Sequence, residues 1–333
     1  MKKTTISFLA LMLVSLTRSG AQVPGAAQQV ESVQQRRQLD QSANRQQEGE
    51  GAPELYPGET SDTGPQSVLR IKPRKTWFEA QADVQYFYTD NMFLTDNNEQ
   101  AADVLVSTVE LALAPTAYPL GGGQFAPRIG YRHQWFDYGL WCATIDNTNF
   151  KLREFDFNAQ TAFADARWSR DNWILEAGFD YQSLMTAESY EQFYQEYVPR
   201  WGLQRLFPLC ESSVLAVGYA GDYRFTDEDV PFFIPSDLND RTDHSLFVNF
   251  TTAVCKHAVV QPYYRFKYTH FTDDLVDRDD YLHSFGIAVH CFLTRNISVR
   301  AFVNYEILES SNQFVPEYNK LDAGGGVNFN IRF

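Results

Sequence analysis

The chain has 333 residues and a formal net charge of −14, from 28 lysines and arginines against 42 aspartates and glutamates. This acidic balance argues against nucleic acid as a partner. Aromatic residues make up 15% of the chain, a proportion expected where aromatic girdles lie at membrane interfaces.

Residues 1–21 have the pattern of a secretory signal peptide. Two lysines precede an apolar run over residues 6–16, and small residues precede the expected cleavage site before Gln22. The run is too short to span a bilayer comfortably, which disfavours the alternative of an anchor helix. Removal of this segment leaves 25 basic and 42 acidic residues, and no other run approaches the length of a transmembrane helix. A mature chain in a membrane would therefore have to form a closed barrel.

Residues 22–75 differ in composition from the rest of the chain. The first part is rich in Gln and the second in Gly, Pro and acidic residues. Such low apolar content does not offset the entropy of ordering, so we predict a flexible periplasmic extension that is disordered or transiently helical. A short coiled coil over Val30–Leu39 is an alternative, although the heptads are not sustained. The sequence also leaves open whether a periplasmic partner binds this extension.

From Thr76 to Phe333 apolar and polar residues alternate, which predicts β-strands with one apolar and one polar face. About twelve segments show this pattern, and they cover residues 76–88, 103–114, 128–136, 155–163, 173–182, 197–203, 214–225, 246–254, 260–270, 283–291, 297–307 and 321–333. An even count is what a single-chain bacterial outer-membrane barrel needs. We therefore predict an all-β fold, a transmembrane antiparallel up-and-down β-barrel of residues 76–333.

The connections between these segments support the same fold. They are mostly short after even-numbered segments, as at 169–172, 255–257 and 294–296, and longer after odd-numbered ones, as at 225–243 and 271–280. In outer-membrane barrels short turns face the periplasm and long loops face the exterior. Both termini are then expected on the periplasmic side.

The chain ends in GVNFNIRF, where Phe329, Ile331 and Phe333 alternate with polar residues. Pairing of the last strand with the first would hold Phe333 in place and remove both free edges. The ending resembles the C-terminal signal of bacterial outer-membrane proteins, a terminal aromatic residue read by the barrel-assembly machinery. The stretch YTDNMFLTD at 88–96 resembles the TDNxFLT motif of porin-like outer-membrane β-barrel proteins. The resemblance implies a location in the outer membrane of a Gram-negative envelope, in contact with its lipid and lipopolysaccharide.

A soluble β-sandwich or lipocalin-like barrel is the alternative fold. Its apolar faces would point inward, so about twelve long aromatic-rich strands would have to share one core. This requirement favours the membrane barrel.

The best candidate for enzymatic chemistry is YTHFTDD at 268–274. It places His270 and Thr272 two residues apart, beside Asp273, and an H-x-S pair with a further Asn or acid is how outer-membrane lipid hydrolases present a nucleophile and base. Here Thr replaces Ser, and acids stand where an Asn on a neighbouring strand is expected. We therefore predict an interfacial histidine and no enzyme, with lipid hydrolysis as the less favoured alternative.

Neither a metal site nor another cofactor site is predicted. The acidic clusters at 227–229 and 273–280 lack the DxDxDG spacing of a calcium loop and are expected to be solvated. The four cysteines show no CxxC or CxxH spacing; they are Cys142, Cys210, Cys255 and Cys291. A Cys210–Cys255 disulfide and four free thiols both remain open. The GGG at 121–123 is expected to form a turn.

Charged residues on the predicted inner face divide into two walls. The first five strands place acids inward with two arginines, namely Glu79, Asp83, Glu110, Asp156, Glu176, Asp180, Arg128 and Arg132. The other strands place mainly bases inward, namely Arg200, Arg224, Arg265, Lys267, Arg300, Lys320 and Arg332, against Glu196, Asp222, Glu306 and Asp322. Opposed walls of opposite sign would set a transverse field across the lumen. We predict a porin-like passive channel for small polar solutes; the alternative is a purely structural barrel with a plugged, salt-bridged lumen.

Overall fold

The computed structural model describes residues 25–39, 76–96, 99–140, 152–210, 212–229, 235–273, 277–312, 315 and 317–333. These residues form thirteen strands, a short 3-10 helix (η1, Leu152–Phe155) and one α-helix over residues 25–39. None of the helices in this described part is long and apolar enough to cross a membrane.

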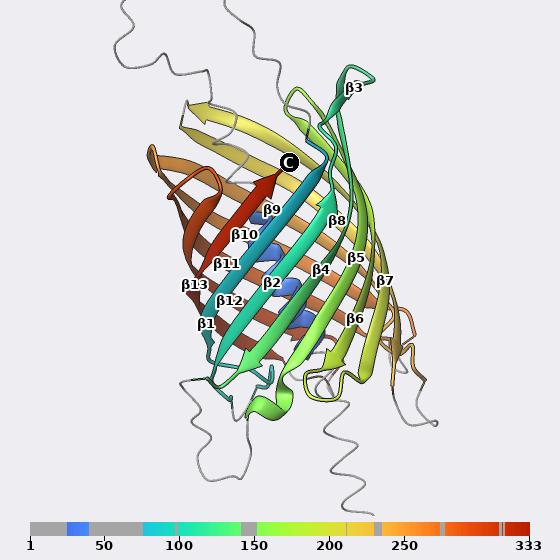
Figure 1. The fold of residues 1–333 in the computed structure, drawn as a ribbon. Helices are drawn as coiled ribbons and strands as arrows, with labels where there is room; N and C mark the ends of the chain where they lie inside the picture. The colour runs from blue at the N-terminus through green and yellow to red at the C-terminus, as the bar shows by residue number, and fades with distance from the viewer. Residues whose placement is uncertain are drawn as a thin grey trace, which may run out of the picture.

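Twelve strands form a closed antiparallel barrel (Figure 1). They are β1 (Phe78–Thr89), β2 (Ala102–Leu113), β4 (Gly123–Tyr138), β5 (Phe157–Arg170), β6 (Trp173–Thr186), β7 (Gln192–Cys210), β8 (Ser213–Glu228), β9 (Arg241–Cys255), β10 (Ala258–Phe271), β11 (Asp279–Phe292), β12 (Ile297–Ser310) and β13 (Tyr318–Arg332). Each pairs with its neighbours in sequence, β2 pairs with β4, and β13 pairs with β1 to close the wall. The prediction of an all-β up-and-down barrel of about twelve strands is confirmed.

The connections differ in length between the two ends of the barrel. At one end, here called the short-turn end, short connections join β5 to β6, β7 to β8, β9 to β10 and β11 to β12. At the other, the long-loop end, longer connections join β1 to β2, β4 to β5, β8 to β9 and β10 to β11, and parts of these lie outside the described residues. Two connections depart from the rule, since 187–191 is short and 114–122 carries the additional strand β3 (Tyr118–Leu120).

The predicted glycine turn lies between β3 and β4. Gly121 and Gly122 have φ of 60° and 80°. This left-handed backbone favours glycine, so the GGG sequence serves the tight reversal of this hairpin.

The chain terminus lies in the seam that closes the barrel. The Phe333 carbonyl accepts hydrogen bonds from the backbone N–H of Trp77 and of Phe78, at 3.0 and 2.9 Å, and the Phe333 N–H donates to the Phe78 carbonyl at 3.0 Å. The two phenyl rings stack with centroids 5.9 Å apart. The terminal residue is therefore held by the first strand, as predicted.

The polar face of most strands points inward. On β1 the side chains of Glu79, Gln81 and Asp83 are buried, whereas Val84 and Tyr88 are exposed on the outer wall. The same alternation leaves large apolar residues on the outside of the other strands, including Leu111, Ile129, Phe179, Leu246, Phe285, Val303 and Phe329. The barrel thus has an apolar exterior and a polar interior.

The prediction that Asp156 points inward implies that Phe157, Ala159 and Phe163 point outward, and this face assignment of the segment 155–163 is wrong. Phe157, Ala159 and Phe163 of β5 are buried inside the barrel. The Phe157 ring stacks on Phe136 of β4 with centroids 4.4 Å apart. Alternation alone gives two faces but does not identify the inner one, and here an apolar layer inside the long-loop end takes the phenylalanines.

Substitution of Phe333 by Asp is expected to lower the fraction of chains that refold into a closed barrel in detergent. The stacked pair with Phe78 is worth about 0.5–1.5 kcal/mol, and a carboxylate in the seam adds a cost of desolvation. The assay compares the gel migration of unheated and boiled protein. Val254→Asp is the matched control, because Val254 is exposed at the same rim but lies outside the seam. Equal losses in both variants would mean that the terminal position has no special role.

Candidate functional site

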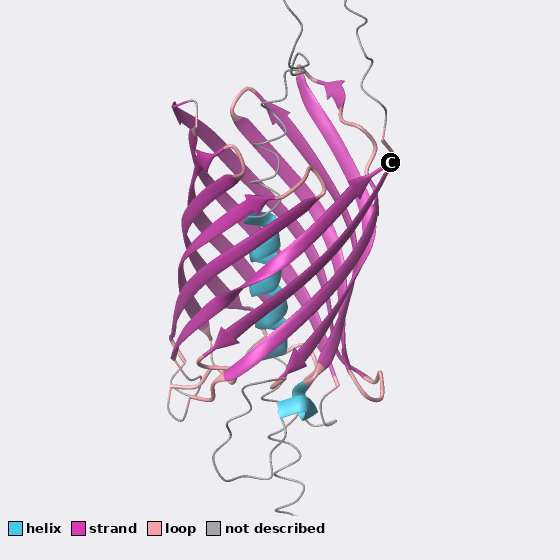
Figure 2. Cartoon of the chain, turned by 60° about the vertical axis from the view of Figure 1, so that its left-hand side comes forward, coloured by secondary structure: helices cyan, strands magenta, loops and turns pink. Residues whose placement is uncertain are grey.

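An α-helix formed by residues 25–39 lies inside the barrel, and we call it the lumen helix (Figure 2). The predicted flexible extension therefore does not hold for these residues. The remaining parts of the predicted signal peptide and extension, residues 1–24 and 40–75, lie outside the described residues. Order in a polar, Gln-rich segment follows from partners on the surrounding wall.

The lumen helix runs from the long-loop end toward the short-turn end. Gly25 and Ala26 lie in one cleft with Met92, Phe93 and Phe155, which belong to long-loop connections. Twelve residues later, Arg37 contacts β1 and β2 in the halves that lie nearer the short-turn end. The helix thus lies along the lumen.

One side of the lumen helix is apolar. Ala26, Ala27, Val30 and Val33 recur at helical spacing and are buried in the inner apolar layer, whose other members include Phe87, Phe136, Phe157 and Phe302. The Arg36 guanidinium lies over the rings of Phe87 and Phe302, 4.5 and 4.7 Å from their centroids. Cation–π contact and apolar packing therefore hold the same side of the helix.

A basic cluster on the wall binds the single glutamate of the lumen helix. Lys267 Nζ donates to both carboxylate oxygens of Glu31, at 3.0 and 2.8 Å. Arg265 Nη2 donates to the same carboxylate at 3.2 Å and its Nη1 donates to Gln35 at 3.1 Å. Arg224 lies 3.8 Å from Glu31. The negative charge of the helix thus faces the predominantly basic wall.

The two arginines of the helix meet acidic groups. Arg37 donates to Gln81 and to Glu110, both at 2.9 Å, and its side chain is only 2% exposed. Arg36 donates to Asp322 at 3.1 Å. Glu110 also forms ion pairs with Arg128 and Arg132 of β4. The helix therefore carries charges opposite in sign to those of the wall groups it contacts.

The other predicted lumen charges form ion pairs within the wall. The pairs are Asp83 with Arg300, Asp180 with Arg200, Glu79 with Arg128 and Arg332, Glu306 with Lys320, and Glu196 and Asp222 with Arg224. Glu176 is 48% exposed near the short-turn end and lies 3.7 Å from Arg167. These ion pairs cancel much of the predicted transverse field, and the helix charges Glu31, Arg36 and Arg37 cancel more of it.

The prediction that Asp156 lines the lumen is wrong, because Asp156 does not belong to a strand of the wall. It lies in the connection before β5, where its carboxylate accepts a hydrogen bond from the Tyr138 backbone N–H at 2.8 Å. Burial raises the pKa of Asp156 to about 6. Its role in the structure is to join the ends of β4 and β5.

Sequence reasoning missed the charged residues of the lumen helix. The available signal was the helical spacing of Ala26, Ala27, Val30 and Val33, which marks one narrow apolar stripe. It also missed Asp165 and Asp243, whose carboxylates pair with Arg200 and Arg224. Asp165 was missed because the sequence reasoning assigned the wrong inner face to β5.

His270 and Thr272, the pair considered for lipid hydrolysis, have other partners. His270 Nδ1 lies 2.8 Å from Asp279 Oδ1, while Thr272 Oγ1 lies 3.2 Å from Asp240 O and 3.0 Å from Asp273 Oδ2, either of which can accept its one hydroxyl proton. His270 is exposed on the outer wall. Among the described residues no hydrogen bond joins His270 to Thr272.

The cysteines and acidic clusters show no assembled metal site within the described part of the chain. Cys210, Cys255 and Cys291 are free and exposed, so the Cys210–Cys255 disulfide is absent, and Cys142 lies outside the described residues. Asp227 accepts a hydrogen bond from Gln195, and Glu228 accepts one from Asn239. Both of these carboxylates are thus hydrogen-bonded to neighbouring side chains.

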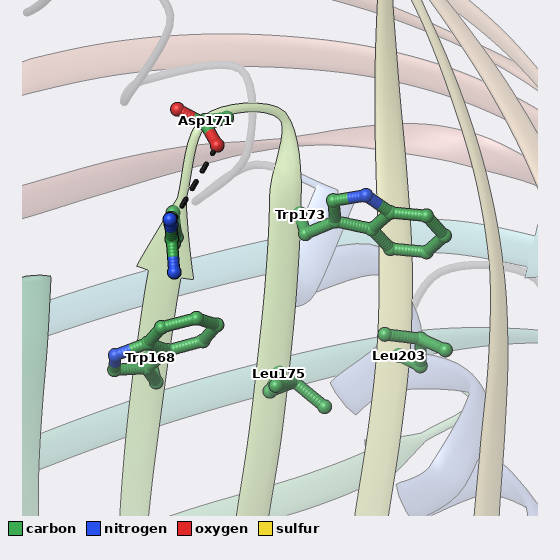
Figure 3. Close-up of a pocket in the computed structure, with 6 residues that line it drawn as sticks. Trp168, Asp171, Trp173, Leu175 and Leu203 are labelled. Atoms are coloured by element: carbon green, nitrogen blue, oxygen red, sulfur yellow. Dashed lines mark ion pairs between the residues drawn. The ribbon is translucent and has the colours of Figure 1, made fainter. Parts of the chain in front are cut away.

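A shallow cleft of about 320 Å³ lies near the short-turn end, over β5, β6 and β7 (Figure 3). Trp168, Trp173, Leu175 and Leu203 line it, beside the Arg170–Asp171 ion pair. Trp173, Leu175 and Leu203 are exposed on the outer wall. This cleft therefore faces away from the lumen and belongs to the apolar exterior.

No protein-family model and no curated protein matches the chain. Among solved structures, an outer-membrane channel from Pseudomonas putida F1 has 13% identity and a TM-score of 0.47, covering 82% of this chain and 100% of that one. The β-domain of the Bordetella autotransporter BrkA has 14% identity and a TM-score of 0.44, covering 77% and 100%. The KdgM porin, solved with oligogalacturonate, has 13% identity and a TM-score of 0.38, covering 75% and 98%. These proteins are outer-membrane β-barrels, and similarity at this level carries no argument about function.

Proposed function

We propose that this protein is an outer-membrane channel for small polar solutes, closed by its own lumen helix and opened when that helix leaves its site. The observation that carries the proposal is the helix itself, a separate element seated along a polar lumen through side-chain contacts. A barrel wall and a removable plug are the parts that a gated pore needs.

The placement in the membrane is supported by the outer wall. The barrel strands have 12 to 19 residues, more than the 9 to 11 that a tilted strand needs to cross the hydrocarbon core. Apolar side chains cover their outer faces, and Trp77 and Trp173 are exposed near the short-turn end. We place that end, with Phe333, at the periplasm. Outer-membrane lipid and lipopolysaccharide would surround the wall, and the barrel-assembly machinery would insert it.

The wall retains partners for its acidic groups without the helix. Glu110 keeps Arg128 and Arg132, and Asp322 keeps Lys320 at 3.5 Å. Departure of Arg36 and Arg37 therefore leaves no isolated carboxylate at these positions. Water entering the vacated lumen would solvate the groups that remain.

A purely structural barrel is the second candidate, and the apolar side of the helix favours it. Val30 and Val33 are fully buried, and Arg36 lies against two rings. Helix departure exposes this surface, which opposes opening. A helix that never leaves would make the protein a sealed scaffold.

Recordings from full-length protein in planar bilayers separate the two candidates. Glu31→Gln removes the charge held by Lys267 and Arg265, and hydrogen bonds to charged groups contribute about 1.5–3 kcal/mol. We expect openings on the order of tenfold more frequent than in the wild type, with unchanged amplitude. Glu309→Gln, at an exposed position of β12, is the matched control and should behave as the wild type. A Glu31→Gln protein as silent as the wild type would favour the sealed scaffold.

A further inference from the structure

The basic cluster around Glu31 contains two cations whose ion-pair partner comes from the helix, and of these Lys267 also interacts electrostatically with the wall carboxylate Asp243. The ion pairs of Lys267 and Arg265 among the described residues go to Glu31. Lys267 is only 8% exposed, although it carries a charge. Arg224 differs, because the wall gives it Glu196, Asp222 and Asp243.

The wall, and not the helix, positions this cluster. Lys267 and Arg265 are two residues apart on β10, so both point inward. Ser245 of the paired strand β9 accepts two hydrogen bonds from Arg265, at 3.1 and 2.9 Å. The cations should therefore stay in place when the lumen helix departs.

One carboxylate serves the two cations of the cluster that have no ion pair to the wall among the described residues. Arg224 and Arg241 have the wall carboxylates Glu196, Asp222, Asp243 and Glu228 beside them, whereas Arg265 and Lys267 form their ion pairs with Glu31. The neighbouring wall carboxylates would repel a more highly charged anion.

We propose that Arg265 and Lys267, with Arg224 behind them, form a binding site for the carboxylate of a small acidic solute, and that Glu31 occupies this site when the channel is closed. A solute carboxylate would compete with Glu31 and so release the lumen helix. The inference rests on the proposed function, because it names the solute class of the same pore. It assigns the channel a ligand, a single carboxylate on a polar body.

The probe is glucuronate, with glucose, which carries a hydroxymethyl group in place of the carboxylate, as the neutral control. We expect glucuronate to raise the opening frequency of the full-length channel at constant ionic strength, and glucose to have no effect. Lys267→Gln weakens the hold on Glu31 and on glucuronate alike, so it should already open more often without solute, and glucuronate should raise its opening frequency by a clearly smaller factor than in the wild type. Lys256→Gln, in the exposed turn before β10, should respond as the wild type. Equal responses to both sugars, or a normal response in Lys267→Gln, would overturn the assignment.

Calorimetry in detergent keeps the site testable if no channel conducts. Glu31→Gln protein keeps the whole chain but loses the competing carboxylate, so it should bind glucuronate about tenfold more tightly than the wild type. The combined Glu31→Gln, Lys267→Gln protein should lose this binding. If the bilayer recordings show no openings but calorimetry gives the expected binding of glucuronate, the channel is refuted and the binding site is retained. Conduction without any selective binding of glucuronate by Glu31→Gln protein would refute the site and retain the channel.

Discussion

Deletion of residues 25–39 is expected to give a barrel that conducts continuously, where the full-length protein opens only briefly. A helix with its side chains is about 10–12 Å across, so its removal leaves a water-filled path of roughly that width through a lumen lined by charged groups. This is the largest functional change that the structure predicts. Single-channel recording would show steady steps in place of rare events.

The deletion needs controls for folding and for chain length. The deleted protein should still migrate differently before and after boiling, because β1 and β13 pair without the helix. A full-length protein with residues 25–39 in scrambled order should also conduct, since Glu31 and Arg37 would no longer meet their partners. A folded but non-conducting deleted barrel would show that wall side chains fill the lumen by themselves.

Arg300→Met is expected to produce the largest loss of stability. Arg300 of β12 reaches across β13 to Asp83 of β1, with Nη1 and Nη2 donating to the two carboxylate oxygens at 2.8 and 2.9 Å. The two side chains are 4% and 0% exposed. Removal of Arg300 leaves the buried Asp83 carboxylate with hydrogen bonds from Gln85 and Asn328 but without its ion pair, and loss of one partner of a buried pair typically costs about 3–5 kcal/mol. Urea unfolding in detergent, followed by tryptophan fluorescence, would measure the change.

Two variants test whether the loss comes from the stranded charge. Arg300→Met with Asp83→Leu removes both charges and should recover most of the stability, because an apolar pair in place of a buried ion pair is often neutral. Arg295→Met, in the exposed turn before β12, should change little. A double variant as unstable as Arg300→Met would indicate lost packing instead of an unpaired charge.

The alternation of polar and apolar residues predicted the barrel, because this pattern depends only on the residues within each strand. Each strand needs only its own sequence to define two faces, and most strands then place polar groups inward. β5 shows the limit of that information. Phe157, Ala159 and Phe163 define one face correctly, but their inward direction depends on Phe136 and on the lumen helix, which are distant in sequence.

The lumen helix could not be predicted from composition. Its residues are mostly polar, and a polar segment in water does not gain enough by folding. Within the barrel several of its polar groups find partners, such as Gln34 with Gln182 and Ser32 with Glu306. The candidate site combines residues from distant segments of the chain. Its wall residues Arg224, Arg265 and Lys267 were predicted to line the lumen, whereas Glu31 of the helix was not.

The helix and the wall belong to one chain, separated by residues 40–75. In the proposed gate, reclosure would therefore be a unimolecular event that does not depend on protein concentration, and the connecting segment would set the effective concentration of Glu31 at the site. A free carboxylate of equal intrinsic affinity has to reach that concentration before it holds half of the sites. The tether thus sets a threshold, so a cell would admit the solute mainly when it is abundant outside.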